Sequence, residues 1–160
     1  MRTLIGTALL MLPIVASSGL DPISQFEGYY TAPATHCSRL DGEQLRPCDP
    51  PEEDCLLVKR IDETHATIDI DSVQSHGTEC GVSGIAELQE KSLVYVEKNP
   101  ASPDAGKGIA LQLAGKNLKI RYLAAPERDS APFCGVRARL DWLQFSLARR
   151  RPVDDRRCGP

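Results

Sequence analysis

Hydrophobic and polar residues alternate along much of the chain, with the two-residue period of β-strands. The clearest example is ATIDIDSV, in which Ala66, Ile68 and Ile70 alternate with polar neighbours. A strand with this pattern buries one face and exposes the other. Further β-rich runs lie at residues 26–32, 56–61, 81–88, 93–98, 109–113, 118–123, 133–140 and 143–148.

The regular spacing of these runs predicts an all-β fold class. Short strands joined by tight turns are typical of an antiparallel meander that closes into a small barrel, or of a sandwich. We therefore expect a single small antiparallel meander barrel (or sandwich) of about eight or nine strands. Residues 114–117 predict a tight hairpin, and the Pro-, Asp- and Ser-rich residues 99–108 and 124–132 predict exposed loops.

The N-terminal residues predict a secretory signal peptide. The positive charge of Arg2 precedes an apolar run from Leu4 to Leu12, and small residues follow Pro13. The run is about half the roughly 20 residues that a membrane-spanning helix requires. We therefore expect cleavage between Ala16 and Gly19, and a bacterial protein that is periplasmic or secreted. No cysteine lies near the expected cleavage site, so no lipid anchor is expected. No membrane span is expected either, because no later segment is long and apolar enough.

The chain then divides into three expected parts. Residues 1–19 are the signal peptide, residues 20–148 the β-barrel domain, and residues 149–160 a flexible, arginine-rich tail. The middle part has the length of one domain.

The six cysteines of this exported chain predict disulfide bonds. Cys37, Cys48 and Cys55 are separated by ten and six residues, which is neither the C-x₂₋₄-C spacing of zinc sites nor the C-x-x-C spacing of redox centres. We therefore expect no metal and a disulfide-stapled barrel.

The pairing follows in part from the strand pattern. Cys80 and Cys134 each open a strand-like run just ahead of a glycine, and we expect them to be bonded to each other. The other expected bonds are Cys37 with Cys48 or Cys55, and the remaining thiol of these with Cys158.

The charges are distributed unevenly along the chain. Residues 20–132 hold eleven Lys and Arg against nineteen Asp and Glu, whereas residues 133–160 hold seven Arg against three Asp. Ten of the acids lie between Asp41 and Asp71. Such asymmetry favours an electrostatic surface that steers a cationic partner. The acidic balance and the few aromatic residues argue against nucleic acid as a partner.

The sequence contains no recognisable catalytic motif. Gly81-Val82-Ser83-Gly84 lacks the last glycine of G-x-S-x-G, because Ile85 stands there. Ser-x-x-Lys and H-E-x-x-H are absent. Asp69 and Asp71 lie two residues apart, on one face of a strand, and are expected to form a solvated surface. We therefore expect no enzyme and no cofactor.

One resemblance adds to this interpretation. The segments FEGYYTA, CGVSGIAEL, LVYVEK, LQLAGKNLKI and FCGVRARLDWLQF occur in an order that resembles uncharacterised exported small β-barrel proteins of Gram-negative bacteria. It is also similar to β-domains associated with periplasmic lysozyme inhibitors, over most of residues 28–147. The resemblance implies that Ser83-Gly84 corresponds to a Ser-Gly pair of the lysozyme-inhibitor barrels, and Lys107-Gly108 to their later Lys-Gly loop. Ile85 and Ala86 follow where the family has a tyrosine.

We therefore expect an exported, non-catalytic protein-binding β module, and specifically an inhibitor of a lysozyme or another cell-wall hydrolase. The alternative is a lipocalin-like carrier, which would hold a small apolar ligand in a barrel cavity. Glu52 to Asp54 are expected in a Pro-flanked docking loop with little core packing. Trp142 is expected to be partly exposed, at a tight turn between the last two strands. The candidate binding residues are Lys107, Ser83, Trp142, Glu52, Glu53 and Asp54.

Overall fold

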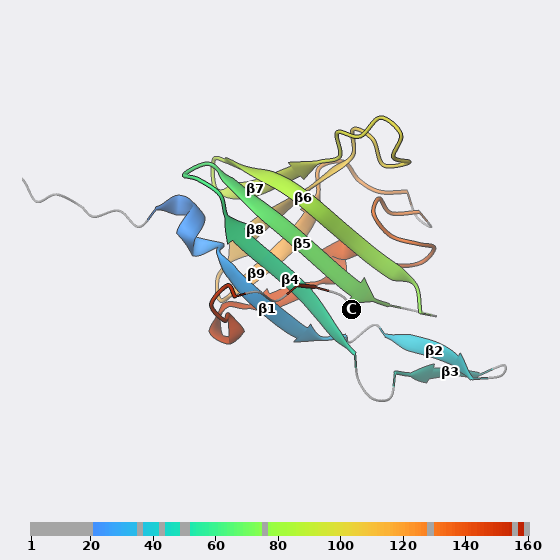
Figure 1. The fold of residues 1–160 in the computed structure, drawn as a ribbon. Helices are drawn as coiled ribbons and strands as arrows, with labels where there is room; N and C mark the ends of the chain where they lie inside the picture. Colours follow the sequence, from blue (N-terminus) through green and yellow to red (C-terminus); the bar gives the residue numbers. More distant parts are fainter. Residues whose placement is uncertain are drawn as a thin grey trace, which may run out of the picture.

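The fold is an antiparallel meander of eight strands that forms a nearly closed barrel, as the sequence predicts (Figure 1). The computed structural model describes residues 21–34, 37–41, 44–48, 52–74, 77–127, 130–154 and 157–158. The expected signal peptide lies outside these residues. In the order of the sheet, the strands are β1 (Gly28–Pro33), β4 (Glu53–Arg60), β5 (His65–Val73), β6 (Glu79–Gln89), β7 (Ser92–Val96), β8 (Gly108–Ala114), β9 (Asn117–Tyr122) and β10 (Gln144–Ser146).

The first and last strands come together to close the barrel. The ring centroids of Tyr30 in β1 and Phe145 in β10 lie 6.4 Å apart inside it. After β10, residues Leu147–Arg149 form the 3-10 helix η3. Arg151 then exchanges two backbone hydrogen bonds with Tyr29, each 2.9 Å long. The chain beyond β10 therefore pairs with β1 along the part of the barrel wall that the short β10 does not reach.

The inward side chains fill the barrel. β5 shows the reason, because Ala66, Ile68 and Ile70 point inward and are at most 2% exposed, as their alternation predicts. A cavity large enough for a ligand would leave the side chains around it accessible. Twelve large side chains are instead 0 to 2% exposed, namely Tyr30, Phe145, Ile23, Leu56, Ile68, Ile70, Leu93, Ile109, Leu111, Leu118, Ile120 and Leu140. The described interior is therefore a packed core.

The N-terminal segment closes one end of the barrel (Figure 1). The 3-10 helix η1 (Pro22–Gln25) starts where the Asp21 carboxylate accepts a hydrogen bond from the Ile23 amide, at 3.1 Å. Proline early in the helix suits this start, since its fixed φ matches and its missing N–H would have no helical partner. Ile23 is fully buried and Phe26 is 2% exposed. Together they cover the core at this end.

Residues 131–140 cap the opposite end, and here the predicted strand over residues 133–140 is wrong. Phe133 and Arg137 have φ of 65° and 66°, which a regular strand does not accommodate. The disulfide to Cys80 holds Cys134 against the start of β6, and Ala138 and Leu140 are buried on the core. The alternation of this segment therefore reflects a cap that turns across the barrel end.

A small hairpin lies outside the barrel between β1 and β4. Its strands are β2 (Ser38–Asp41) and β3 (Gln44–Pro47), which the sequence pattern did not predict. The Cys37–Cys48 disulfide closes its base. A hairpin of two strands has little core of its own, so this bond replaces packing that the hairpin lacks.

The predicted cysteine pairing is confirmed. Cys80 is bonded to Cys134, and the alternatives left open are resolved as Cys37 with Cys48 and Cys55 with Cys158. The last bond spans 103 positions of sequence and fixes the C-terminal segment to β4. Thus the described part of the predicted tail, residues 149–154 and 157–158, is tied to the rest of the chain. Arg150 donates to the Ser24 and Gln25 carbonyls, Arg151 pairs with Tyr29, and Cys158 is bonded to Cys55. Among the described residues, no helix has the length and apolar character needed to cross a membrane.

Candidate functional site

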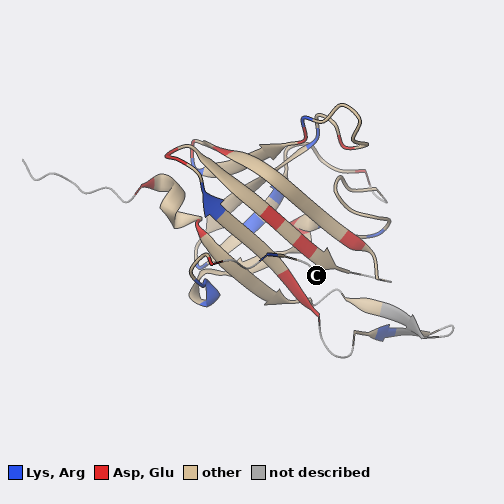
Figure 2. Ribbon diagram, viewed as in Figure 1, with Lys and Arg blue, Asp and Glu red and all other residues tan. Residues whose placement is uncertain are grey.

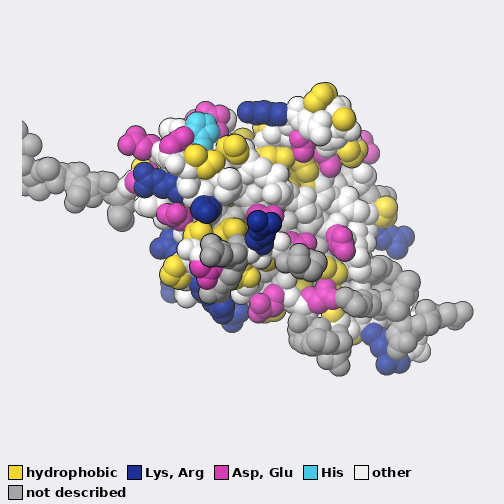
Figure 3. Space-filling view, viewed as in Figure 1, with side chains coloured by type: hydrophobic (Ala, Val, Ile, Leu, Met, Phe, Trp, Pro, Cys, Tyr) yellow, Lys and Arg dark blue, Asp and Glu magenta, His cyan; other side chains and the backbone are white. Residues whose placement is uncertain are grey.

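Four carboxylates gather on the outer surface of β4, β5 and β6, and we call this surface the acidic face. Two of them, Asp69 and Asp71, follow one another on the outward side of β5 (Figure 2). Glu79 begins β6, where it lies opposite Val73, and Glu52 immediately precedes β4. Figure 3 shows Asp and Glu side chains spread over this side of the molecule. Three of these acids belong to the acid-rich residues 41–71, whereas Glu79 joins them only through the strand register.

Asp71 lies at the electrostatic centre of the acidic face. Its pKa is raised above the usual value of 3.8, first because burial removes water from the carboxylate. The neighbouring charges of Glu79, Asp69 and Glu52 raise it further. In the register, Asp71 lies between Cys55 of β4 and Gly81 of β6, so only a glycine stands beside it on the β6 side. The acidic face therefore concentrates negative charge that a cationic group would relieve.

The C-terminal segment crosses one edge of the acidic face. Tyr29, Leu57 and Asp69 are aligned across β1, β4 and β5 by the strand register. Arg151 is bonded to Tyr29, and the Cys158 amide donates a hydrogen bond of 3.2 Å to the Asp69 carboxylate. Leu57 lies between these two anchoring points in the register; it points outward and yet is only 9% exposed. The segment is therefore fixed on both sides of this apolar residue.

The expected docking loop from Glu52 to Asp54 is only partly a surface. Glu53 is exposed, but Asp54 is 4% exposed, so the expectation that this segment carries little core packing is wrong for it. The Ser72 hydroxyl donates a 2.6 Å hydrogen bond to the Asp54 carboxylate. Asp54 is turned inward because β4 begins at Glu53, and alternate residues of a strand point to opposite faces. Neutralising Asp54 would therefore disturb a buried polar network.

That network joins the barrel to its cap. Gln74, which is 1% exposed, donates to the Ser72 hydroxyl at 3.2 Å. Its side-chain amide also donates to the Arg139 carbonyl and accepts from the Arg139 amide, both at 2.9 Å. The Gln74 side chain thus pairs with the Arg139 backbone as a neighbouring strand would. These bonds fix the cap just before Leu140.

Lys107 lies in the expected loop between β7 and β8. Its ammonium group makes an ion pair of 3.2 Å with Asp104 and remains half exposed. The other oxygen of Asp104 accepts a 3.0 Å hydrogen bond from the Phe133 amide, and the Phe133 carbonyl accepts from the Gly81 amide at 2.9 Å. The Lys107 loop is therefore linked, through the cap, to the β6 end of the acidic face.

The other two predicted site residues lie apart from each other. Ser83 is exposed in the middle of β6, opposite Asp69, so it belongs to the acidic face. Trp142 is 43% exposed, which confirms the expected partial exposure. It ends the 3-10 helix η2 (Leu140–Trp142) before β10, and the expected turn between two strands is wrong because residues 133–140, directly before it, form no strand.

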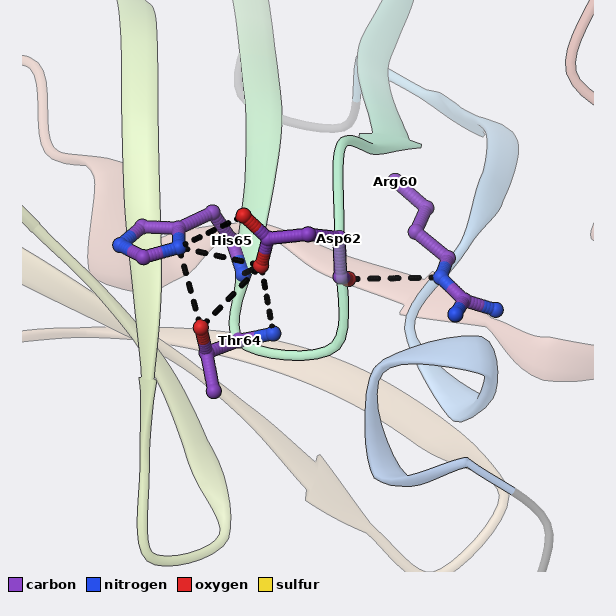
Figure 4. A network of polar contacts seen from close by, with 4 residues as sticks. All are labelled: Arg60, Asp62, Thr64 and His65. Atoms are coloured by element: carbon purple, nitrogen blue, oxygen red, sulfur yellow. Dashed lines mark hydrogen bonds and ion pairs between the residues drawn. The ribbon is translucent and has the colours of Figure 1, made fainter.

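A hydrogen-bonded turn between β4 and β5 contains the only histidine among the described residues (Figure 4). One oxygen of Asp62 accepts from the amides of Thr64 and His65, both at 2.8 Å. Nδ1 of His65 faces both the Asp62 carboxylate, at 3.1 Å, and the Thr64 hydroxyl, at 3.0 Å. A catalytic triad needs one ring nitrogen for the carboxylate and the other for the nucleophile. This arrangement stabilises a turn and has no such geometry. His36 and His76 lie outside the described residues.

One group of side chains has the composition of a metal site. The sulfurs of Cys37 and Cys48 and a carboxylate oxygen of Glu52 lie within 4.8 Å of one another. The two sulfurs are joined in a disulfide, and metal binding by cysteine requires the thiolate. The group is therefore a structural disulfide beside a carboxylate, and its sulfurs cannot serve as metal ligands.

Comparisons of the chain with protein-family models, with curated proteins and with solved structures find no match.

Proposed function

We propose that this chain is an exported, non-catalytic β-barrel that binds another protein through its outer surface. The observation that carries the proposal is the packed interior, in which twelve large side chains are 0 to 2% exposed. A carrier of apolar ligands needs an internal cavity, and both ends of this barrel are covered as well, by η1 and by residues 131–140. Packing therefore favours a binding module over a lipocalin-like carrier. The three disulfides support export, because cytosolic thiols are kept reduced.

The acidic face indicates the charge of the partner. The partner relieves repulsion around Asp71 if it places a cationic group there, and the same field accelerates its approach. Lysozymes are exported, positively charged proteins, so an exported chain can meet them outside the cytosol. We therefore propose a cationic cell-wall hydrolase, a lysozyme in particular, as the partner, and a periplasmic or secreted location for the chain.

The Lys107 loop supplies a means of inhibition in this proposal. A hydrolase of glycosidic bonds uses a pair of carboxylates in a cleft. The ammonium of Lys107 is half exposed and can exchange its surface ion pair with Asp104 for a carboxylate in such a cleft. Because the loop is linked to the β6 end of the acidic face through Phe133, one partner can contact both surfaces.

Association kinetics with a c-type lysozyme test the proposal. In the variant Asp71→Asn/Glu79→Gln, the association rate should fall about 3- to 10-fold with a smaller change in the dissociation rate, because surface charges act mainly on encounter. Raising ionic strength from about 0.1 M to about 1 M shortens the screening length from about 10 Å to about 3 Å and should remove most of this difference.

The matched control is Glu63→Gln/Glu90→Gln, which removes the same charge from exposed positions away from the acidic face. Asp54 is left intact because it is buried. Equal rates for the two double variants would refute the acidic face as the docking surface. An apolar molecule that copurifies with the protein would instead favour the carrier.

A further inference from the structure

A second surface, independent of the acidic face, lies on the outside of β8 and β9. A groove of about 690 Å³ is open there to solvent. Gln112 of β8 lies opposite Lys119 of β9, and Arg121 follows two residues later on the same face. These side chains point outward, since the alternate residues Leu111, Leu118 and Ile120 are buried in the core. The other lining residues are Leu113 and Ala114 of β8, Ile120 and Tyr122 of β9, Ala125 and Pro126 of the loop that follows β9, and Arg139 and Asp141 beyond it.

The groove carries an excess of positive charge. Lys119, Arg121 and Arg139 line it against a single acid, Asp141. Asp141 is already occupied, because it accepts bonds of 2.8 and 2.6 Å from the Arg139 guanidinium. Lys119 and Arg121 make no ion pair with any described residue, and Arg121 has only a weak 3.5 Å contact with Gln112. The lining therefore offers two positive charges that no described acidic residue neutralises.

The geometry favours a ligand of limited size. Adjacent residues on one face of a strand are separated by about 7 Å, so Lys119 and Arg121 present their charges side by side. Arg139 is held in place by Asp141, and its backbone is held by Gln74. Ala125 and Pro126 add apolar surface to the same groove. Volumes of roughly 300 to 1,000 Å³ suit small organic ligands.

We propose that this groove binds a small organic dianion, whose two negative charges match Lys119 and Arg121 and whose body lies on the apolar lining. Phosphate esters and dicarboxylates share this chemistry, and guanidinium groups suit both. The site is separate from the packed interior, so it does not require the barrel to act as a carrier. It is also separate from the acidic face, which lies on β4, β5 and β6.

The chain contains a built-in reporter for this test. Trp142 is the only tryptophan, is 43% exposed and directly follows the groove residue Asp141. Glucose 6-phosphate and succinate are the two probes, with glucose as the uncharged counterpart of the first and inorganic phosphate as an anion without an organic body. Titration calorimetry and Trp142 fluorescence should show saturable binding of at least one probe at millimolar concentration or below.

Lys119→Gln and Arg121→Gln should each weaken that binding about tenfold or more, because a hydrogen bond to a charged group is lost. Lys116→Gln is the matched control: it removes the same charge from the exposed β8–β9 turn, which does not line the groove. The proposal is overturned if neither probe saturates, if glucose binds as well as its phosphate, or if Lys116→Gln weakens binding equally. Binding of inorganic phosphate as tightly as both probes would also overturn it, since the apolar lining would then contribute nothing.

Discussion

Removing the Cys55–Cys158 disulfide should destabilise the protein more than removing the bond at the outer hairpin. The first bond spans 103 positions and the Cys37–Cys48 bond spans 11. In the chain-entropy account, cross-links of these lengths stabilise the folded state by about 4.7 and about 2.8 kcal/mol. The expected difference between the double variants Cys55→Ala/Cys158→Ala and Cys37→Ala/Cys48→Ala is therefore about 2 kcal/mol.

The position of the C-terminal segment should add to this difference. Without the bond, Cys158 no longer holds the segment at Asp69, which lies opposite Leu57 in the register. Leu57, an outward apolar side chain that is now 9% exposed, should then meet more water. Exposing a leucine costs about 1.5 to 3 kcal/mol when the exposure is complete, and less here because the Arg151 contact remains.

Urea unfolding followed by Trp142 fluorescence and by far-UV circular dichroism measures both variants, and neither variant contains an unpaired thiol. Equal free energies of unfolding in the two variants would refute the reasoning. That result would mean that the tail stays in place through its other contacts, and that the long bond closes a loop already ordered in the unfolded chain.

Three further outcomes follow from the side-chain contacts. Gln74→Ala should lower the free energy of unfolding by about 2 to 4 kcal/mol, since it leaves the Arg139 amide and carbonyl without their buried partner; urea unfolding measures it. Hydrogen bonds, first from the Thr64 amide, lower the pKa of Asp62 to about 2 from its ordinary 3.8. The ionised carboxylate therefore contributes to folding stability above about pH 4, and this contribution is lost as pH falls through about 2. A carboxyl titration by NMR that places Asp62 at its ordinary value would contradict this. Burial raises the pKa of Tyr122 to about 12, so its phenol should stay neutral at pH 10 in an ultraviolet titration of the folded protein.

The strands could be predicted because their signal is local. Each central strand alternates side chains between a packed core and water, and this period is written directly in segments such as residues 66–71. The pairing of Cys80 with Cys134 was predicted correctly although residues 133–140 form no strand. The two cysteines form an isolated antiparallel bridge, so the cap meets β6 at this one pair of residues as a neighbouring strand would.

The cap and the tail depend on contacts between residues far apart in sequence. Residues 133–140 alternate like a strand, but the bonds to Gln74 and Cys80 and the left-handed backbone at Phe133 and Arg137 turn them across the barrel end. The acidic face likewise depends on register, which brings Glu79 beside Asp71. The local sequence pattern contains no information on register. For this reason the predicted docking surface included the buried Asp54 and omitted Glu79.

The most direct test of the proposed function is an inhibition assay. The mature protein, at micromolar concentration and low salt, is added to c-, g- and i-type lysozymes, and muramidase rates and complex formation are measured together. The account predicts that at least one class is bound and inhibited, that binding weakens with salt, and that Lys107→Ala reduces inhibition more than it reduces binding. Full muramidase activity and no complex with any class would contradict it.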